Sequence, residues 1–156
     1  MTFTTQIKDE ITKNYDSTPE SLISLCTYLR FNSTFDNHKI SVYTENASVA
    51  RWLFKLLKIH YNIEIKLTTR TIKRFKKRNI YILEIKDKFD YITSDIENTL
   101  TNIKEGSTEE KIAFIEGAFL AVGNVSNPST SGYHLEFIFT KERLAKQVLN
   151  LLILFF

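Results

Sequence analysis

Six of the chain's 21 lysine and arginine residues fall between Arg70 and Arg78, in a turn that joins two strand-like segments. They surround one aromatic side chain, Phe75. A hairpin tip of this composition can contact a phosphate backbone, because cations that share a turn face the same row of phosphates. A turn that only needs charge to stay solvated would have the same composition, so the local sequence leaves both interpretations open. The candidate phosphate-binding cations, including one from the preceding strand, are Lys66, Arg70, Lys73, Arg74, Lys76, Lys77 and Arg78.

Side chains that commonly bind metals or act as nucleophiles are few and poorly spaced. His134 and Glu136 alternate on one predicted strand, and a His-x-Glu pair also begins the zinc-deaminase signature. That signature requires two further cysteines, whereas Cys26 is the single cysteine here, so a surface strand pair is the favoured interpretation. Cys26 lies among apolar residues, which indicates a buried and unreactive thiol. The sequence has no Walker, Rossmann or nucleophile-elbow pattern and no zinc-ligand spacing, so we expect neither a cofactor nor a metal.

The segment from Phe114 to Phe139 predicts a helix, a turn and a strand. Along this helix, Ala113, Gly117 and Ala121 recur every four residues, and Gly123 ends it. One face of the helix therefore has almost no side chain, which lets a second backbone pack at close range. Such a face is usually a tight core contact, so it indicates no function by itself.

The composition is that of an ordinary globular protein, and we expect residues 1–156 to form one domain. Apolar residues make up 43% of the chain, charged residues 25% and aromatic residues 13%, which excludes a disordered chain. No apolar run is long enough to cross a bilayer, and the first residues lack the apolar core of a signal peptide. We therefore expect a cytoplasmic protein that does not interact with membranes. The net charge of +3 is only mildly basic, so the distribution of the cations is more informative than their total.

Hydrophobic periodicity and capping signals predict the elements that position these residues. In the first half, the predicted elements are a helix within residues 1–14, a helix over Pro19–Phe31, strands over Ser33–Phe35 and Lys39–Tyr43, and a helix from Thr44 to Leu57. Ser17 and Glu20 have the spacing of a capping box, and Thr44 is the expected N-cap of the next helix.

In the second half, the predicted elements are strands over Ile63–Thr68 and Ile80–Ile85, a helix over Phe89–Ile103, the helix opened by a Ser107–Glu110 capping box, a strand, and a helix from about Lys141. We expect the first of these strands to bury one face, because Ile63, Ile65 and Leu67 alternate with polar residues. The order of elements over residues 17–104 begins again over residues 107–156. This order indicates an internal duplication.

The last predicted helix has an apolar face, and from Leu151 to Phe156 no polar residue interrupts it. A complete second repeat needs two further strands and a helix beside this face, so we expect the face to lie uncovered. Burying one leucine or phenylalanine side chain is worth about 1.5–3 kcal/mol, which favours self-association through this helix or makes the chain unstable and poorly soluble. The alternative is that Leu151–Phe156 folds back onto the existing sheet. The residues of this face are Leu144, Val148, Leu151, Leu152, Ile153, Leu154, Phe155 and Phe156.

Three segments resemble a known architecture: GAFLAVGNVSNPSTSGYHLE from Gly117, YLRFNSTF over Tyr28–Phe35, and TENASVARWLFKLL over Thr44–Leu57. They resemble the LAGLIDADG homing-endonuclease fold and, among its branches, the WhiA family of bacterial regulators. The resemblance implies an α+β domain with one complete αββαββα repeat and a truncated αββα repeat. It also implies two helices packed at a pseudo-twofold axis, above a saddle of strands that lies on DNA. The positions expected to pack these helices together are Thr27, Ala113, Gly117, Ala121 and Gly123.

The chain departs from the nuclease pattern where the chemistry would require acids. Asn32 and Val122 occupy the helix-end positions at which an active nuclease carries Mg²⁺-binding carboxylates. Valine cannot bind a metal, and asparagine supplies only a neutral oxygen. We therefore expect no endonuclease activity.

The resemblance favours a non-catalytic DNA-binding domain of a nucleoid-associated WhiA-like transcription regulator, involved in cell division, chromosome segregation or sporulation. Its expected partner is double-stranded DNA, over which the saddle would hold the cationic hairpin. The alternative is a structural domain that binds a protein partner in transcription regulation, with DNA left to the helix-turn-helix that the family carries and this sequence lacks. An active endonuclease is the least favoured of the three.

Overall fold

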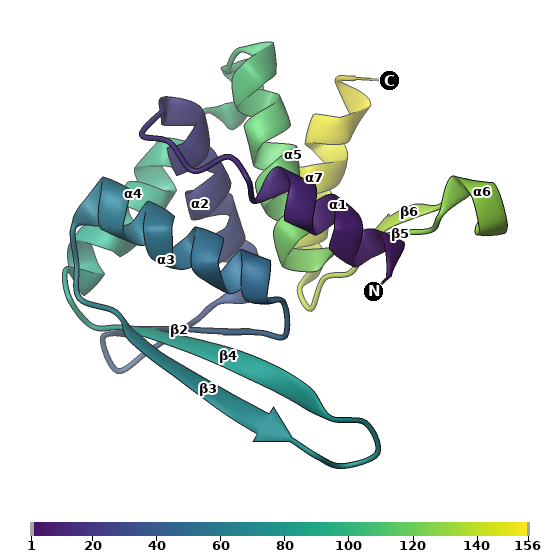
Figure 1. The fold of residues 1–156 in the computed structure, drawn as a ribbon. Coiled ribbons are helices and arrows are strands. Elements are labelled where there is room, and N and C mark those ends of the chain that lie inside the picture. Colours follow the sequence, from purple (N-terminus) through teal and green to yellow (C-terminus); the bar gives the residue numbers. More distant parts are fainter. Residues whose placement is uncertain (1, 156) are drawn as a thin grey trace.

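The computed structural model describes residues 2–155, which form an α+β fold (Figure 1). A four-stranded antiparallel sheet of order β1-β2-β4-β3 carries helices on one face, and a smaller sheet pairs β5 with β6. The predicted α+β class is therefore confirmed. The helices are α1 (Phe3–Ile11), α2 (Pro19–Asn32), α3 (Ala47–Tyr61), α4 (Phe89–Leu100), α5 (Thr108–Val122), α6 (Pro128–Ser131) and α7 (Glu142–Ile153). The strands are β1 (Thr34–Asp36), β2 (Lys39–Thr44), β3 (Lys66–Ile72), β4 (Arg78–Ile85), β5 (Gly123–Val125) and β6 (Leu135–Phe137).

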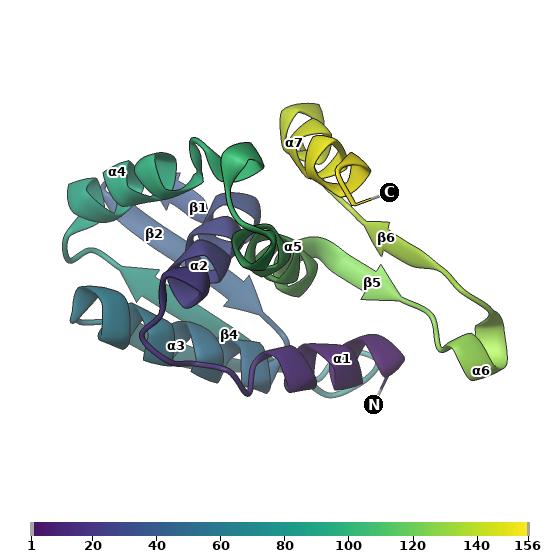
Figure 2. The ribbon, with the colours of Figure 1, turned by 90° about the horizontal axis from the view of Figure 1, so that it is seen from above.

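The elements follow the order that the sequence predicts. From α2 to α4 the order is helix, two strands, helix, two strands, helix, and the second series begins at α5. The short α6 occupies the predicted turn between β5 and β6. Seen from above, α5 lies between the half that contains the large sheet and the half that contains β5, β6 and α7 (Figure 2).

The capping box of α2 lies one residue later than predicted. Thr18 is the N-cap: its hydroxyl accepts the Ser21 N–H, and the Ser21 hydroxyl accepts the Thr18 N–H. The prediction of Ser17 and Glu20 is wrong because Pro19 restricts the residue before it to extended backbone, which is also the N-cap conformation. Thr18 has this conformation, with φ −114° and ψ 159°.

The predicted N-cap of α3 is also displaced, whereas that of α5 is confirmed. Thr44 remains in β2, paired with Tyr81, and its hydroxyl accepts the N–H of Asn46. Asn46 then caps α3, and its side chain accepts the N–H of Val49, because strand pairing holds the chain in β2 up to Thr44. Ser107 and Glu110 form the predicted capping box at the start of α5.

The prediction that residues 63–68 form a strand with one buried face is wrong. Ile63 is buried before the strand begins, Ile65 is partly buried, and Leu67 in β3 is 48% exposed. The strand instead runs from Lys66 to Ile72 at the edge of the sheet, where Leu67 borders an open groove beside α3. Hydrophobic alternation therefore predicted that a strand exists here but misplaced its start. The burial of each strand residue depends on which helix packs against it, and the local sequence does not show this.

The predicted small-residue contact is the close packing of α2 against α5. The hydroxyl of Ser24 donates a hydrogen bond to the carbonyl oxygen of Ala113, at 2.8 Å. A Cβ atom on Gly117 would lie 2.5 Å from the carbonyl oxygen of Ser24 and 2.9 Å from the Cβ of Thr27. Thr27 and Ala113 are both buried. The second backbone expected on this face is therefore that of α2.

The two remaining packing positions act within the second half of the chain. Ala121 is partly buried against the core. A Cβ atom on Gly123 would lie 2.2 Å from the ring of Phe119, so a glycine is needed there for space. The nearest atoms to this position all belong to Phe119, so Gly123 makes its closest approach to its own helix and not to α2.

The expectation that α7 leaves its whole apolar face uncovered is wrong. The helix packs back against α5 and buries Leu144, Val148 and Leu151. Leu152 is partly buried, Ile153, Leu154 and Phe155 remain exposed, and Phe156 lies outside the described residues. Self-association through α7 stays a prediction, and it now concerns the exposed side chains only.

We expect Gly117→Ala to destabilise the fold. Alanine in place of glycine normally stabilises a helix by up to about 1 kcal/mol, but overpacking against the α2 backbone costs about 1–3 kcal/mol. Urea titration should therefore show a lower free energy of unfolding. Ile112→Ala, at an exposed position of the same helix, should change it by less than about 0.5 kcal/mol. A Gly117→Ala variant as stable as the parent would contradict the close contact.

The buried face of α7 leads to a second expectation. Leu151→Ala should lower the free energy of unfolding by about 2–5 kcal/mol, because it leaves a cavity against α5. Leu149→Ala, two residues earlier and exposed, should have an effect below about 0.5 kcal/mol. Thermal and urea unfolding of both variants measure the difference. Similar losses, or none in either variant, would mean that α7 does not pack on α5.

Candidate nucleic-acid interface

The strand register separates the predicted cations from the helix-covered face of the sheet. Lys66 pairs with Glu84 and Arg70 with Ile80, so the side chains of these residues share one face. Leu83 and Ile85 alternate with them on β4 and are fully buried beneath the helices. Lys66 and Arg70 therefore point away from the helices, as the sequence predicts for the wet face.

The turn between β3 and β4 forms a projecting tip made of Lys73, Arg74, Phe75, Lys76 and Lys77. The tip extends beyond the helices (Figure 1). Phe75 is 99% exposed and has a left-handed backbone, with φ +65°. The N–H of Lys76 donates to the carbonyl oxygen of Arg74, which closes the turn, and the Arg74 guanidinium lies 5.8 Å from the centre of the Phe75 ring.

The predicted cations differ in how available they are. Within residues 2–155, Lys73, Lys76 and Lys77 form no ion pair. Arg78 lies 3.2 Å from Glu45, in a pair whose side chains are both about half exposed. A pair this exposed contributes at most about 1 kcal/mol, so Arg78 can exchange Glu45 for a phosphate at little cost.

Lys39 is a further cation on this face that the sequence did not single out. It lies at the start of β2, with its Nζ 3.1 Å from Glu84 Oε2. The hydrogen bond from Lys39, its charge and the charge of Lys66 lower the pKa of Glu84. The face is therefore mixed in charge near its base and strongly basic only towards the hairpin tip. A single lysine gives no local signal, and only the sheet register brings it beside the others.

The two nuclease-type positions lie at equivalent ends of the central helix pair. Ser24 contacts Ala113 and Thr27 contacts Gly117, so α2 and α5 run parallel. Their last residues are therefore at the same end of the pair, and they are Asn32 and Val122.

Both positions serve the fold. The amide of Asn32 donates to the hydroxyl of Tyr28, at 2.8 Å. The carbonyl oxygen of Val122 accepts the N–H of Ile138, at 3.0 Å. In the part of the chain that the structure describes, no cluster of three histidine, cysteine, aspartate or glutamate side chains could hold a metal ion.

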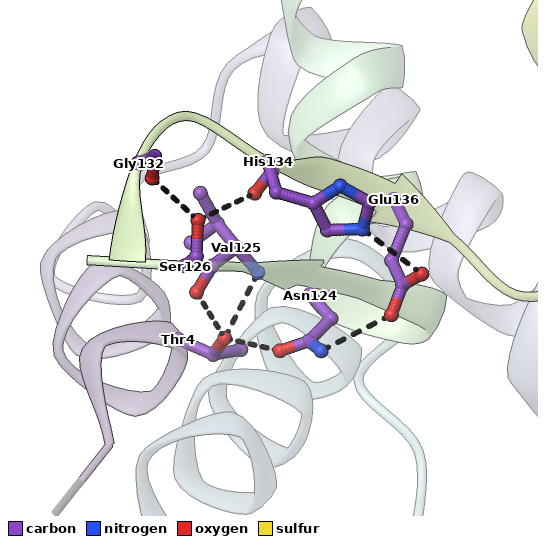
Figure 3. Close-up of polar contacts among 7 residues, drawn as sticks. All are labelled: Thr4, Asn124, Val125, Ser126, Gly132, His134 and Glu136. Carbon is purple, nitrogen blue, oxygen red and sulfur yellow. Dashed lines mark hydrogen bonds and ion pairs between the residues drawn. The ribbon is translucent and has the colours of Figure 1, made fainter. Parts of the chain in front are cut away.

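His134 and Glu136 are part of a polar network on the smaller sheet (Figure 3). His134 Nε2 lies 3.3 Å from Glu136 Oε2, and the amide of Asn124 donates to the other carboxylate oxygen of Glu136. These hydrogen bonds, first from Asn124 and then from His134, lower the pKa of Glu136. The network continues to Thr4 in α1, whose hydroxyl accepts the N–H of Val125. His134 lies one residue before β6 and Glu136 within it, both at the surface, and the network attaches α1 to β5.

Cys26 has the environment that its neighbours in the sequence predict. Its side chain is fully buried, and burial raises the pKa of the thiol to about 11. Its Sγ lies 3.7 Å from the hydroxyl of Tyr61. A thiol that stays protonated and inaccessible at neutral pH is not a nucleophile.

None of the helices within residues 2–155 has the length and apolar character needed to cross a membrane.

Comparisons with known proteins agree on one family. A family model described as the WhiA N-terminal LAGLIDADG-like domain matches residues 20–98, and one described as the WhiA LAGLIDADG-like domain matches residues 111–155. A probable cell division protein WhiA of Bacillus cytotoxicus is 36% identical over 149 residues, which cover 87% of this chain and 47% of the relative. The corresponding protein of Listeria monocytogenes is also 36% identical, with 87% and 46% covered. The chain thus spans about half the length of the curated relatives it matches.

Two solved structures share the fold. The crystal structure of the N-terminal LAGLIDADG domain of WhiA aligns with a TM-score of 0.75 and 22% identity, over 99% of this chain and 75% of that one. The full-length WhiA structure from Thermatoga maritima aligns with a TM-score of 0.73 and 21% identity, over 100% and 51%. The LAGLIDADG-like fold implied by the sequence is therefore confirmed.

We expect no DNA cleavage by this protein, because Asn32 and Val122 supply no carboxylate at the helix ends. Plasmid DNA incubated with the protein and either Mg²⁺ or Mn²⁺ should stay supercoiled, which agarose electrophoresis measures. A known nuclease in the same buffers is the control. Nicking that persists through repurification and disappears with EDTA would overturn this expectation.

Proposed function

Because this chain belongs to the WhiA family through its LAGLIDADG-like domain, we propose that it is a non-catalytic DNA-contacting domain of a WhiA-type regulator of cell division. The observation that supports the proposal is the projecting β3–β4 tip, whose three lysines form no ion pair within residues 2–155 and lie next to an exposed phenylalanine. Through this contact, the protein would be held at the nucleoid and would influence genes of division, chromosome segregation or sporulation.

The electrostatics favour contact with the phosphate backbone over reading of bases. The net charge is only +3, so attraction to DNA depends on the local concentration of cations at the tip and along β3. Lysines contact phosphates as point charges and carry little sequence information by themselves. The proposed contact therefore positions the protein on DNA and is largely independent of sequence.

The geometry of the tip supports the same mode. β4 is hydrogen-bonded to β2 on one side and to β3 on the other, so the hairpin has a rigid base. The tip itself is exposed, and its side chains can approach a duplex without displacing any packed residue. Phe75 is the single apolar side chain at the tip and is placed to contact a sugar or the edge of a base.

A second candidate function is that of a protein-binding scaffold, favoured by an apolar groove between α3 and the hairpin. The groove has a volume of about 250 Å³ and includes Phe54, Leu67 and Tyr81. The half-exposed Leu67 is available to a partner side chain there. Binding by this groove would depend little on salt, whereas binding by the tip would depend on it strongly.

The test is a variant with Lys73, Lys76 and Lys77 changed to Glu. If these lysines contact phosphates, affinity for DNA should fall similarly for unrelated duplexes. The slope of log affinity against log salt should become shallower by about 0.9 for each phosphate that the protein no longer neutralises. Fluorescence anisotropy over a series of salt concentrations measures both. The melting temperature should hardly change, because all three side chains are exposed.

A matched control separates a local contact from the change in net charge. The control variant changes the same number of lysines to Glu on the helical part of the molecule: Lys58, Lys104 and Lys111. This variant should bind DNA more tightly than the tip variant does. Equal weakening in the two variants, or unchanged affinity in the tip variant, would refute the proposed contact and favour the scaffold.

A further inference from the structure

A second basic site lies away from the hairpin, in a cavity of about 560 Å³. It is bounded by α4, by α7 and by the junction of α2 with β1. β1 and β3 form opposite edges of the large sheet, so the cavity and the hairpin lie on different sides of the molecule. Its lining residues are Arg30, Ser33, Phe35, Thr93, Ile96, Glu97, Lys141, Arg143, Leu144 and Gln147.

The charge of this lining is positive. The side chain of Arg30 is only 16% exposed, and its guanidinium donates hydrogen bonds to Gln147, at 3.3 Å, and Glu97, at 3.0 Å. Glu97 is the one acid in the lining, and its side chain is 74% exposed, so water weakens its effect on Arg30. Lys141 and Arg143 add two exposed cations at the rim and form no ion pair within the described chain.

Two further features of this cavity have hydrogen-bond donors that an anion could accept from. The hydroxyl oxygen of Ser33 is buried and has no hydrogen-bond partner among the described residues. Buried polar groups of this kind are rare and destabilise a fold unless a ligand or water satisfies them. At the start of α7, Lys141 occupies the N-cap position and makes no side-chain cap. The N–H of Leu144 donates to the carbonyl oxygen of Lys141, which leaves the amides of Glu142 and Arg143 for an external acceptor.

The remaining walls are apolar. Ile96 and Leu144 are largely buried, and Phe35 is 41% exposed, which leaves part of its ring free at the cavity. Ligand pockets typically have volumes of about 300–1,000 Å³, with apolar walls and a few polar groups that fix orientation. Three cations, an unsatisfied hydroxyl and an aromatic ring in such a cavity suit a ligand with a phosphate at one end and a flat ring at the other.

We propose that this cavity binds a nucleoside phosphate. The phosphate lies near Ser33, Arg143 and the start of α7, and the base packs against Phe35. The site is independent of the proposed DNA contact, since it shares no residue with the hairpin tip. A phosphate of the DNA backbone has the same chemistry, so the experiment must distinguish a free nucleotide from DNA.

The test is an NMR titration of ¹⁵N-labelled protein with AMP, with inorganic phosphate and with a DNA duplex. AMP should shift the amides of Ser33, Arg143 and Leu144 saturably, and inorganic phosphate should bind more weakly, because it lacks the base. Arg143→Gln should weaken AMP binding about tenfold, which corresponds to about 1.4 kcal/mol. Lys104→Gln, at an exposed position outside the lining, is the control and should bind as the parent does.

Ser33→Ala gives the sharpest result. It should weaken AMP binding while the melting temperature stays the same or rises, because the substitution removes a buried hydroxyl that no protein group satisfies. A serine with a purely structural role would instead lower the melting temperature. The tip variant that tests DNA contact should bind AMP normally, so the two proposals can fail separately.

Three outcomes would overturn the proposal. The first is no saturable shift at millimolar AMP. The second is equal AMP affinity in Arg143→Gln and Lys104→Gln. The third is a shift of the cavity amides with duplex DNA alone, which would make the cavity part of a DNA interface.

Discussion

The contact between the backbones of α2 and α5 is the constraint on which the rest of the structure depends. Gly117 has no Cβ, so α5 can approach within contact distance of the Ser24 carbonyl, and the Ser24 hydroxyl bonds to α5 in return. This contact joins the two halves of the chain through two parallel helices. Because β1 follows α2 and β5 follows α5, the same contact also determines where each sheet begins.

The parallel pairing brings together the two positions at which a LAGLIDADG nuclease would assemble its metal site. Here those positions are structural. Asn32 bonds to Tyr28, and the carbonyl of Val122 continues the backbone pairing towards Ile138. The polar groups near the second helix end form their own network, in which Asn124 and Glu136 satisfy each other. The helix ends thus retain the geometry of the fold without the carboxylates that the chemistry requires.

The groups that remain available for binding lie at the edges of the large sheet. At one edge, the β3–β4 tip concentrates cations where no helix covers them, so their charges are solvated and destabilise nothing. At the other edge, Arg30 is held in a cavity by Gln147 and Glu97, beside an unsatisfied Ser33. The exposed hairpin tip suits an extended polyanion, whereas the partly enclosed cavity suits a small anionic ligand. The two proposed sites therefore differ in burial more than in residue type.

The sequence by itself determined the order of the elements, the small-residue face of α5, the absence of acids at Asn32 and Val122, and the cationic turn. Each of these depends on residues close together in the chain or on a motif of fixed spacing. Only the tertiary structure decided that Leu67 is exposed, that α7 covers its face on α5, and that Lys39 joins the wet face. It alone also brought Ser33 and Arg30 beside Arg143, more than a hundred residues away. The physical reason is that burial and charge proximity depend on which elements pack together, and local periodicity does not show which elements these are.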